Sequence, residues 1–193
     1  MRLRRRTLPE GLRFPGGKPL TGRLVRLREK KLSDVRNDYR WQTDRELARL
    51  DAAPLLKASF PIYLLDYTEQ VHHLSATRYP LAIETLEGKH IGNCTCYDID
   101  EEKGEAQLGI MIGDRDYWDK GYGADAICTL VDHIFGNTAM KRLYLKTLDW
   151  NTRAQKSFRK CGFTPCGEMK RNGFSFILME LFREQWEQRQ QDS

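Results

Sequence analysis

The segment from Ile110 to Ala126, IMIGDRDYWDKGYGADA, contains the residues best suited to chemistry in this chain. An apolar strand pattern ends in a polar turn, and Gly121 and Gly123 then introduce a helix pattern. Glycines at a helix start let a ligand approach the free backbone N–H groups, where the helix dipole also favours an anion. The segment therefore predicts a seat for a phosphate, such as the pyrophosphate of a nucleotide-like cofactor.

The chain before this segment predicts the elements that hold it in place. Three strand patterns, Leu81 to Leu86, His90 to Ile99 and Glu105 to Ile112, are joined by short turns typical of an antiparallel meander. In the last strand the even-numbered side chains are all apolar and are expected in the core. The odd-numbered side chains then face the other way, where they are free to line a cleft.

Helix and strand patterns alternate after the glycine segment. The helix from Gly121 has an apolar stripe that excludes His133, and Gly136-Asn137 ends it. The next strand and helix put Met111 and Leu145 on neighbouring strands, joined by a right-handed crossover. The other expected elements are strands at 22–28, 141–148, 163–169 and 174–181, and helices at 34–42 (capped by Ser33), 61–76, 152–160 (capped by Asn151) and 183–191.

Length and charge indicate one domain with a basic arm. A chain of 193 residues with 40% hydrophobic residues suffices for one well-buried core. Its first 31 residues hold eleven cations and two anions, a charge of +9, so the rest carries −4 of the net +5. The basic balance therefore belongs to the arm, and nucleic-acid binding by the whole domain loses its main support. We expect a basic extension at 1–20, a single domain at 21–187 and a polar tail at 188–193.

Two further patterns concern location and cysteines. No apolar run approaches the roughly 18 residues that span a bilayer, and no hydrophobic signal core follows the cationic start, so a cytoplasmic protein is expected. Five cysteines without an export signal favour free thiols. A zinc site from Cys94, Cys96, Cys161 and Cys166 is disfavoured, because their spacing matches no common pattern.

These residues resemble the GNAT superfamily of acetyl-CoA-dependent N-acetyltransferases, most closely the branch with the ribosomal-protein and aminoglycoside enzymes. Three segments carry the resemblance: IGN at Ile91 to Asn93, the stretch from Leu108 to Ala126, and NTRAQKSFRKCGF at Asn151 to Phe163. It covers about Gly22 to Trp186. It implies an α+β fold with a mostly antiparallel central sheet, helices on both faces and a V-shaped splay between the central strands.

The resemblance also implies where acetyl-CoA binds. Pantetheine would lie in the V-shaped gap and hydrogen-bond the main chain at Ile110 and Ile112. The pyrophosphate would meet the amides of the glycine segment, where Trp118 replaces the usual Arg or Gln, as is common in the resembled branch. The implied cofactor-binding residues are Ile110, Met111, Ile112, Trp118, Asp119, Lys120, Gly121, Tyr122, Gly123, Ala124, Asn151 and Phe158, and no metal is expected.

Acetyl transfer needs a neutral amine, so a base must take a proton from the ammonium form. Many relatives use a Glu on the splayed strand, but the matching position here is Gln107, whose amide cannot accept that proton. We expect Glu105, about 7 Å along the same face, to act through water. Glu84 and Asp98 on neighbouring strands are alternatives.

The remaining catalytic roles also follow from the resemblance. The tyrosine that protonates the leaving thiolate in many relatives is replaced by Phe158, which donates no proton. A strand amide near Ile110 would polarise the acetyl carbonyl. Asn151 would orient the cofactor or the acceptor, unless it is only a helix cap. Glu105 and Asn151 are therefore the expected catalytic residues.

The acceptor is left open by the sequence. Acidic residues cluster around one turn, at 98, 100, 101, 102 and 105, and would attract a cationic amine. A peptide or protein N-terminus, a polyamine, an aminoglycoside and another small amine all fit. The alternative to an enzyme is a coenzyme A-binding regulatory or sensor protein with little or no catalysis. A homodimer, and a ribosome or RNA contact through the basic arm, also stay open.

Overall fold

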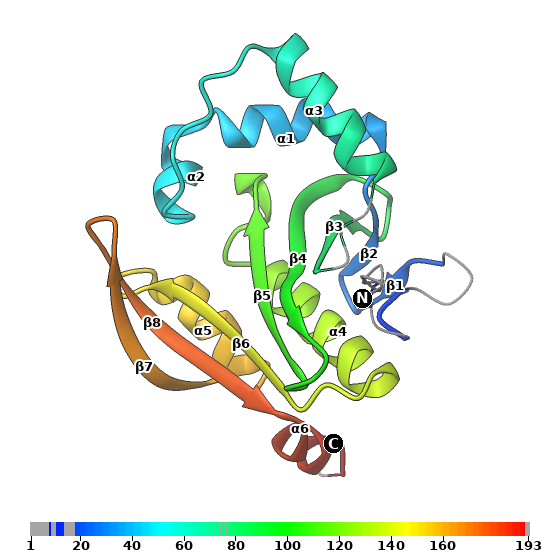
Figure 1. Ribbon diagram of the computed structural model, residues 1–193, viewed down its shortest axis with the longest axis vertical. Helices are drawn as coiled ribbons and strands as arrows, with labels where there is room; N and C mark the ends of the chain where they lie inside the picture. Colours follow the sequence, from blue (N-terminus) through cyan, green and yellow to red (C-terminus); the bar gives the residue numbers. More distant parts are fainter. Residues whose placement is uncertain (1–7, 9–10, 14–17, 74, 76, 192–193) are drawn as a thin grey trace, which may run out of the picture.

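The computed structural model describes residues 8, 11–13, 18–73, 75 and 77–191, so most of the predicted extension and the end of the predicted tail lie outside it. Within the described residues, eight strands form one sheet in the order β1-β2-β3-β4-β5-β6-β8-β7, in which only β5 and β6 pair in parallel. The mixed, mostly antiparallel α+β fold is thus confirmed (Figure 1). The strands are β1 (Leu20–Thr21), β2 (Val25–Glu29), β3 (Arg78–Thr85), β4 (His90–Asp100), β5 (Glu105–Ile112), β6 (Arg142–Leu148), β7 (Thr164–Arg171) and β8 (Phe174–Phe182).

The helices lie in two groups around this sheet (Figure 1). The first group, α1 (Val35–Gln42), α2 (Arg45–Leu50) and α3 (Phe60–His72), lies above the upper ends of β4 and β5. The second, α4 (Tyr122–Asn137) and α5 (Thr152–Lys160), lies behind β4, β5 and β6, and α6 (Arg183–Gln191) follows β8.

The predicted helix bounds differ from the structure mainly in the first group. The sequence did not predict α2, and the helix expected to end at residue 76 ends at His72. The expected cap Ser33 is wrong, because Ser33 lies inside a 3-10 turn and the N-cap of α1 is Asp34.

The apolar stripe of α4 packs on the sheet and forms the main core. Ile127, Leu130 and Ile134 are completely buried there. His133, which the pattern placed off the stripe, is also buried, because Leu12 of the extension lies against that side of the helix. The Nε2 atom of His133 lies 2.9 Å from the Leu12 carbonyl oxygen. Part of the predicted arm therefore belongs to the folded domain.

Strands β5 and β6 separate soon after they begin to pair. They pair at three positions, which end at Gln107 opposite Tyr144. On the other side of β5, β4 contains a bulge between Tyr97 and Asp100, again opposite Gln107 and its neighbour. A bulge bends its strand and increases the local twist. The predicted splay between β5 and β6 thus begins at the level of the sheet where this bulge bends β4.

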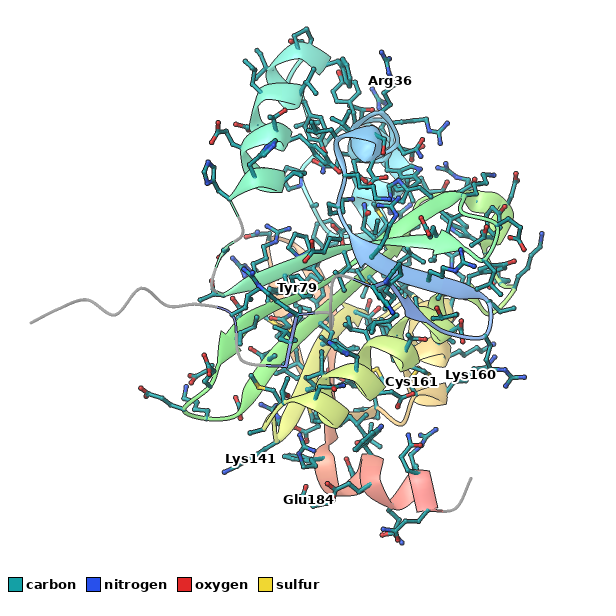
Figure 2. The ribbon with its side chains drawn as sticks, turned by 90° about the vertical axis from the view of Figure 1, so that its right-hand side faces the viewer. Arg36, Tyr79, Lys141, Lys160, Cys161 and Glu184 are labelled. Atoms are coloured by element: carbon teal, nitrogen blue, oxygen red, sulfur yellow. A yellow bond between two sulfur atoms is a disulfide. The ribbon has the colours of Figure 1, made fainter. Side chains whose placement is uncertain are left out.

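Two cysteines contradict the expectation of five free thiols. Cys128 of α4 and Cys161, which follows α5, form a disulfide with a Cα–Cα distance of 5.2 Å (Figure 2). They are separated by 33 positions in the sequence. The packing of α4 against α5 therefore brings them together, and a local sequence pattern does not. Cys94 and Cys96 are free and buried, and burial raises the pKa of each thiol to about 12.

As far as the structure describes the chain, none of its helices combines the length and apolar character needed to cross a membrane.

Gly113 provides a test of the packing between β5 and α1. A methyl group at this position would overlap the indole of Trp41, so Gly113→Ala should lower the free energy of unfolding by about 1–3 kcal/mol. Gly136→Ala on α4 is the control: its new methyl meets no atom within 4 Å, and helix propensity predicts a gain of up to about 1 kcal/mol. Urea denaturation measures both. Equal stabilities of the two variants would contradict this packing.

Candidate functional site

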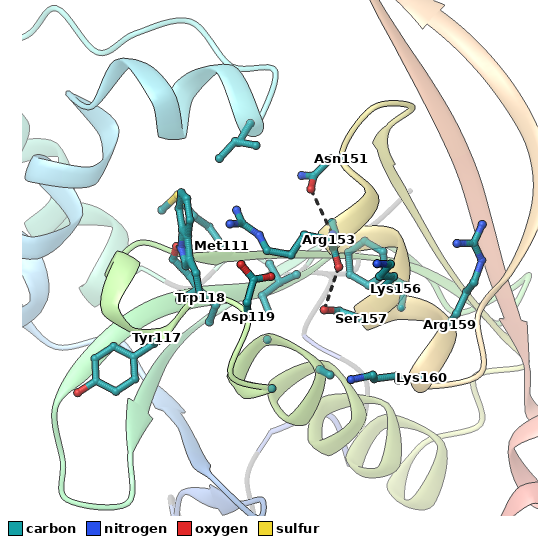
Figure 3. Close-up of a pocket in the computed structure, with 18 of the residues that line it drawn as sticks. Met111, Tyr117, Trp118, Asp119, Asn151, Arg153, Lys156, Ser157, Arg159 and Lys160 are labelled. Carbon is teal, nitrogen blue, oxygen red and sulfur yellow. Dashed lines mark hydrogen bonds between the residues drawn. The ribbon is translucent and has the colours of Figure 1, made fainter.

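A cavity of about 620 Å³ lies where β5 separates from β6 (Figure 3). The end of β5, the segment that leads into α4, the first turns of α5 and the end of α2 line it. Ten predicted cofactor residues are among the lining residues: Ile110, Met111, Ile112, Trp118, Asp119, Gly121, Gly123, Ala124, Asn151 and Phe158. The side chains of Lys120 and Tyr122 are not; Lys120 is exposed, and the Tyr122 ring packs on Tyr117 with centroids 4.9 Å apart.

The edge of β5 offers main-chain hydrogen bonds to this cavity. The N–H of Gly113 bonds to the Ile91 carbonyl at 2.9 Å, so the odd-numbered residues of this stretch bond to β4. The peptide groups of Ile110 and Ile112 then face the gap. The Ile112 carbonyl already accepts a bond from the Trp118 indole at 2.7 Å. The N–H groups of both residues and the Ile110 carbonyl remain for an extended ligand.

The start of α4 forms an anion seat. Gly121 is its N-cap with a φ of 89°, a left-handed conformation that glycine adopts without strain. Residues 122 to 124 then present free N–H groups of the first turn, whereas the N–H of Asp125 bonds to the Gly121 carbonyl at 2.9 Å. The nearby Asp125 carboxylate does not compete for them, because it accepts bonds from the N–H groups of Arg23, Leu24 and Val25 at 2.8–3.1 Å.

Basic side chains of α5 face the same seat. Arg153, Lys156, Arg159 and Lys160 line the cavity together with two carboxylates, those of Asp51 and Asp119. The Arg153 guanidinium stacks on the Trp118 ring, 3.7 Å from its centroid (Figure 3). These four cations were not predicted as site residues from the sequence, although their spacing at 153, 156, 159 and 160 places them on neighbouring helix positions. They make this cavity suitable for a ligand with several phosphates.

Asn151 and Phe158 hold the start of α5 beside the cavity. The Asn151 side chain accepts a bond from the Ala154 N–H at 3.2 Å, so the predicted cap is confirmed. Phe158 is buried, and its ring meets Phe163 edge-on with centroids 6.3 Å apart. Among the described residues, no group of three or more His, Cys, Asp or Glu side chains is arranged to hold a metal ion.

A second cavity of about 660 Å³ lies beneath α1 and α2. Its floor includes Thr95, Tyr97 and Asp98 of β4 and Gly109 of β5. Four residues line both cavities: Leu47, Asp51, Ile110 and Met111. A ligand in the first cavity and a ligand in the second would therefore meet at Ile110 and Met111.

A buried ionic cluster supports the second cavity from below. Asn93, which lines it, donates to the Asp38 carboxylate at 2.6 Å and accepts from the Lys30 ammonium. His90 lies beside them, 3.1 Å from the Asn93 side-chain oxygen. Burial and the charge of Lys30 lower the pKa of His90. The cluster thus holds Asn93 in one orientation and ties α1 to β4.

The predicted base candidates lie in different places. Glu105 is in neither cavity lining; it pairs with Arg142 at 3.3 Å, and Arg142 also binds Glu180 at 2.7 Å. Five strand positions, about 17 Å, separate Glu105 from Ile110. Glu84 is bound to Arg28 at 2.6 Å, whereas Asp98 lines the second cavity. Asp51 lines both cavities; it was not predicted from the sequence, because the short helix α2 that positions it was not predicted.

Comparisons with known protein sequences found one matching family model and several relatives. The family model described as "Acetyltransferase (GNAT) domain" matches residues 24–164. The uncharacterized N-acetyltransferase p20 of Bacillus licheniformis is 26% identical over 149 residues, 75% of this chain and 81% of that protein. The spermine/spermidine N(1)-acetyltransferase of Bacillus subtilis (strain 168) is 31% identical over 85 residues, 44% of this chain and 56% of that protein.

Solved structures share the fold. A spermidine N-acetyltransferase from Vibrio cholerae in complex with CoA and spermine superposes with a TM-score of 0.73 at 18% identity and covers 84% of this chain and 97% of its own. The aminoglycoside acetyltransferase AAC(6')-Ib in complex with coenzyme A superposes with a TM-score of 0.71 at 18% identity. The match covers 86% of this chain and 99% of that structure.

Gly123 tests the anion seat without disturbing the fold. A methyl group at this position lies 3.6 Å from the nearest Ile112 side-chain atom, an ordinary contact, so Gly123→Ala should fold at least as stably as the wild type. The same methyl group would occupy the space next to the free N–H groups. We expect the coenzyme A dissociation constant, measured by calorimetry, to rise at least about tenfold, or 1.4 kcal/mol. Gly136→Ala on the same helix is the control, and unchanged affinity in Gly123→Ala would refute the seat.

Proposed function

Because this chain belongs to the GNAT acetyltransferase family and transfers an acetyl group from acetyl-CoA to an amine, we propose that its acceptor is a small polycationic amine. One observation carries the proposal. The two cavities meet at Ile110 and Met111. Four cations and two carboxylates line the first, whereas the second contains the carboxylates of Asp51 and Asp98 and one cation, Arg78. The charges therefore match an anionic cofactor on one side and a cationic acceptor on the other.

The residues of the first cavity fit acetyl-CoA. The N–H groups at the start of α4 would bind the pyrophosphate, which gives Lys120 and Tyr122 a role through their backbone only. Arg153, Lys156 and Lys160 would neutralise phosphate charge. Pantetheine would run along β5 and bond to Ile110, as a strand bonds to a sheet edge.

The same arrangement brings the reacting groups together. With pantetheine on β5, the thioester lies near Ile110 and Met111, which the acceptor also reaches from the second cavity. The N–H of Ile110 would then stabilise negative charge on the thioester oxygen. Asn151 would hold the cofactor through its amide nitrogen, since its oxygen caps α5.

Two features favour a polyamine as the acceptor. Asp98 has a φ of 51°, an uncommon conformation for a residue other than glycine, in the bulge that places it in the second cavity. Asp98 and Asp51 give this cavity two carboxylates, which suits an acceptor with more than one ammonium group. The similar Bacillus subtilis protein is named a spermine/spermidine acetyltransferase. Aminoglycosides share the polycationic chemistry and are compared in the experiment below.

Two partner predictions stay as predictions: a homodimer, and a ribosome or RNA contact through the basic arm, most of which lies outside the described residues.

The experiment measures thiol release from acetyl-CoA with spermidine, ribostamycin and a monoamine. We expect spermidine to have the highest kcat/KM. Asp98→Asn, which retains a residue type that tolerates positive φ, should raise the KM for spermidine about fivefold and change kcat less, as expected for a charge pair of about 1 kcal/mol in water.

The matched control is Asp66→Asn, an exposed neutralisation on α3 away from both cavities. It should leave KM unchanged. A monoamine preferred over both polycations would overturn the proposed acceptor class.

A further inference from the structure

Asp51 occupies the junction of the two cavities. It is the C-cap of α2 and one of the four residues that line both spaces. The other three, Leu47, Ile110 and Met111, contain no ionisable group. Among the residues the structure describes, Asp51 is therefore the one side chain that can exchange a proton where the two ligands meet.

Contacts at both ends of α2 hold the helix in this place. At its start, Arg115 binds Asp44, the N-cap, and Glu46 at 2.8 Å each. At the other end of the helix, the Arg49 guanidinium lies 5.0 Å from the centroid of the Trp150 ring, in the loop before α5. Since Trp150 follows β6 and Arg115 follows β5, α2 bridges the gap between the splayed strands. Asp51 is thereby kept over the gap.

The carboxylate of Asp51 is available for chemistry. It makes no hydrogen bond or ion pair within the described part of the chain, unlike those of Glu105 and Glu84. Solvent reaches it, yet the cavity walls raise the pKa of its carboxyl, and the charges of Lys146 on β6 and Arg78 on β3 oppose that rise.

The other titratable groups that line the second cavity are Tyr97 and Asp98 of β4 and Arg78 of β3. Burial, Asp98 and Asp51 together raise the pKa of Tyr97 to about 12, so Tyr97 stays protonated at neutral pH.

We propose that Asp51 is the general base that removes a proton from the acceptor ammonium, a role that rests on the proposed acetyl transfer. Asp51 takes one proton from R–NH3⁺, and the neutral nitrogen attacks the thioester carbon. The tetrahedral intermediate collapses and breaks the C–S bond, which releases the coenzyme A thiolate. The nitrogen loses its second proton to solvent and the thiolate gains one, so the net reaction yields the acetamide, the free thiol and one proton.

The test compares Asp51→Asn, Asp51→Glu and Glu105→Gln, with Asp66→Asn as a remote control. The acceptor is spermidine or ribostamycin, whichever the wild type acetylates faster. We expect Asp51→Asn to lower kcat at pH 7 about 10²- to 10⁴-fold, with the coenzyme A dissociation constant within twofold of the wild type. Asp51→Glu should recover part of the rate, and Glu105→Gln should lose less than Asp51→Asn.

The pH profile separates this role from a structural one. In the wild type, kcat/KM should rise with pH less steeply than in Asp51→Asn, because Asp51 removes the proton from the bound ammonium within the complex. In Asp51→Asn it should rise about tenfold per pH unit towards the pKa of the amine, since only free amine then reacts.

Three outcomes would overturn the proposal: a kcat for Asp51→Asn within threefold of the wild type, a larger loss in Glu105→Gln, or an unchanged pH profile. In the first two cases a fully active wild type leaves the proposed function intact. A wild type that binds coenzyme A but acetylates neither amine would overturn the proposed acceptor class and the role of Asp51 together.

Discussion

The early end of pairing between β5 and β6 is the constraint on which the site depends. Paired strands would satisfy each other's peptide groups and leave no room between them. Because the pairing stops at Gln107, the β5 edge at Ile110 and Ile112 is left for a ligand, and cavities open on both sides of these residues. The bulge in β4 coincides with this point and also turns Asp98 into the second cavity. One local irregularity thus serves both the cofactor side and the acceptor side.

The gap has a defined shape because charged contacts hold α1 and α2 above it. Arg28 binds Asp34 through two hydrogen bonds of 2.7 and 2.8 Å, and Lys30 pairs with Asp38 of α1 at 2.5 Å. Buried pairs of this kind cost desolvation, and removing one partner leaves an uncompensated charge. Their effect here is positional: they orient α1, whose Trp41 lies against β5, and the chain then continues into α2 and Asp51.

The features that the sequence predicted well are those set by local chemistry. The bounds of β5 and α5 agree with alternation and helical periodicity, and the caps at Gly121 and Asn151 agree with the preferences of those residue types. The features it missed depend on contacts between distant segments. The Cys128–Cys161 disulfide needs α4 against α5, and the burial of His133 needs Leu12. Asp51 became a candidate only when tertiary contacts placed the short helix α2 over the gap.

The central claim is that the cofactor and the acceptor meet at Ile110 and Met111 from two connected cavities. The most direct measurement is the affinity of a bisubstrate analogue in which the sulfur of coenzyme A is linked through an acetyl bridge to a spermidine nitrogen. If both cavities are engaged at once, the analogue should bind about 10²- to 10⁴-fold more tightly than coenzyme A alone. An analogue that binds no more tightly than coenzyme A, and that does not prevent spermidine from binding, would contradict the account.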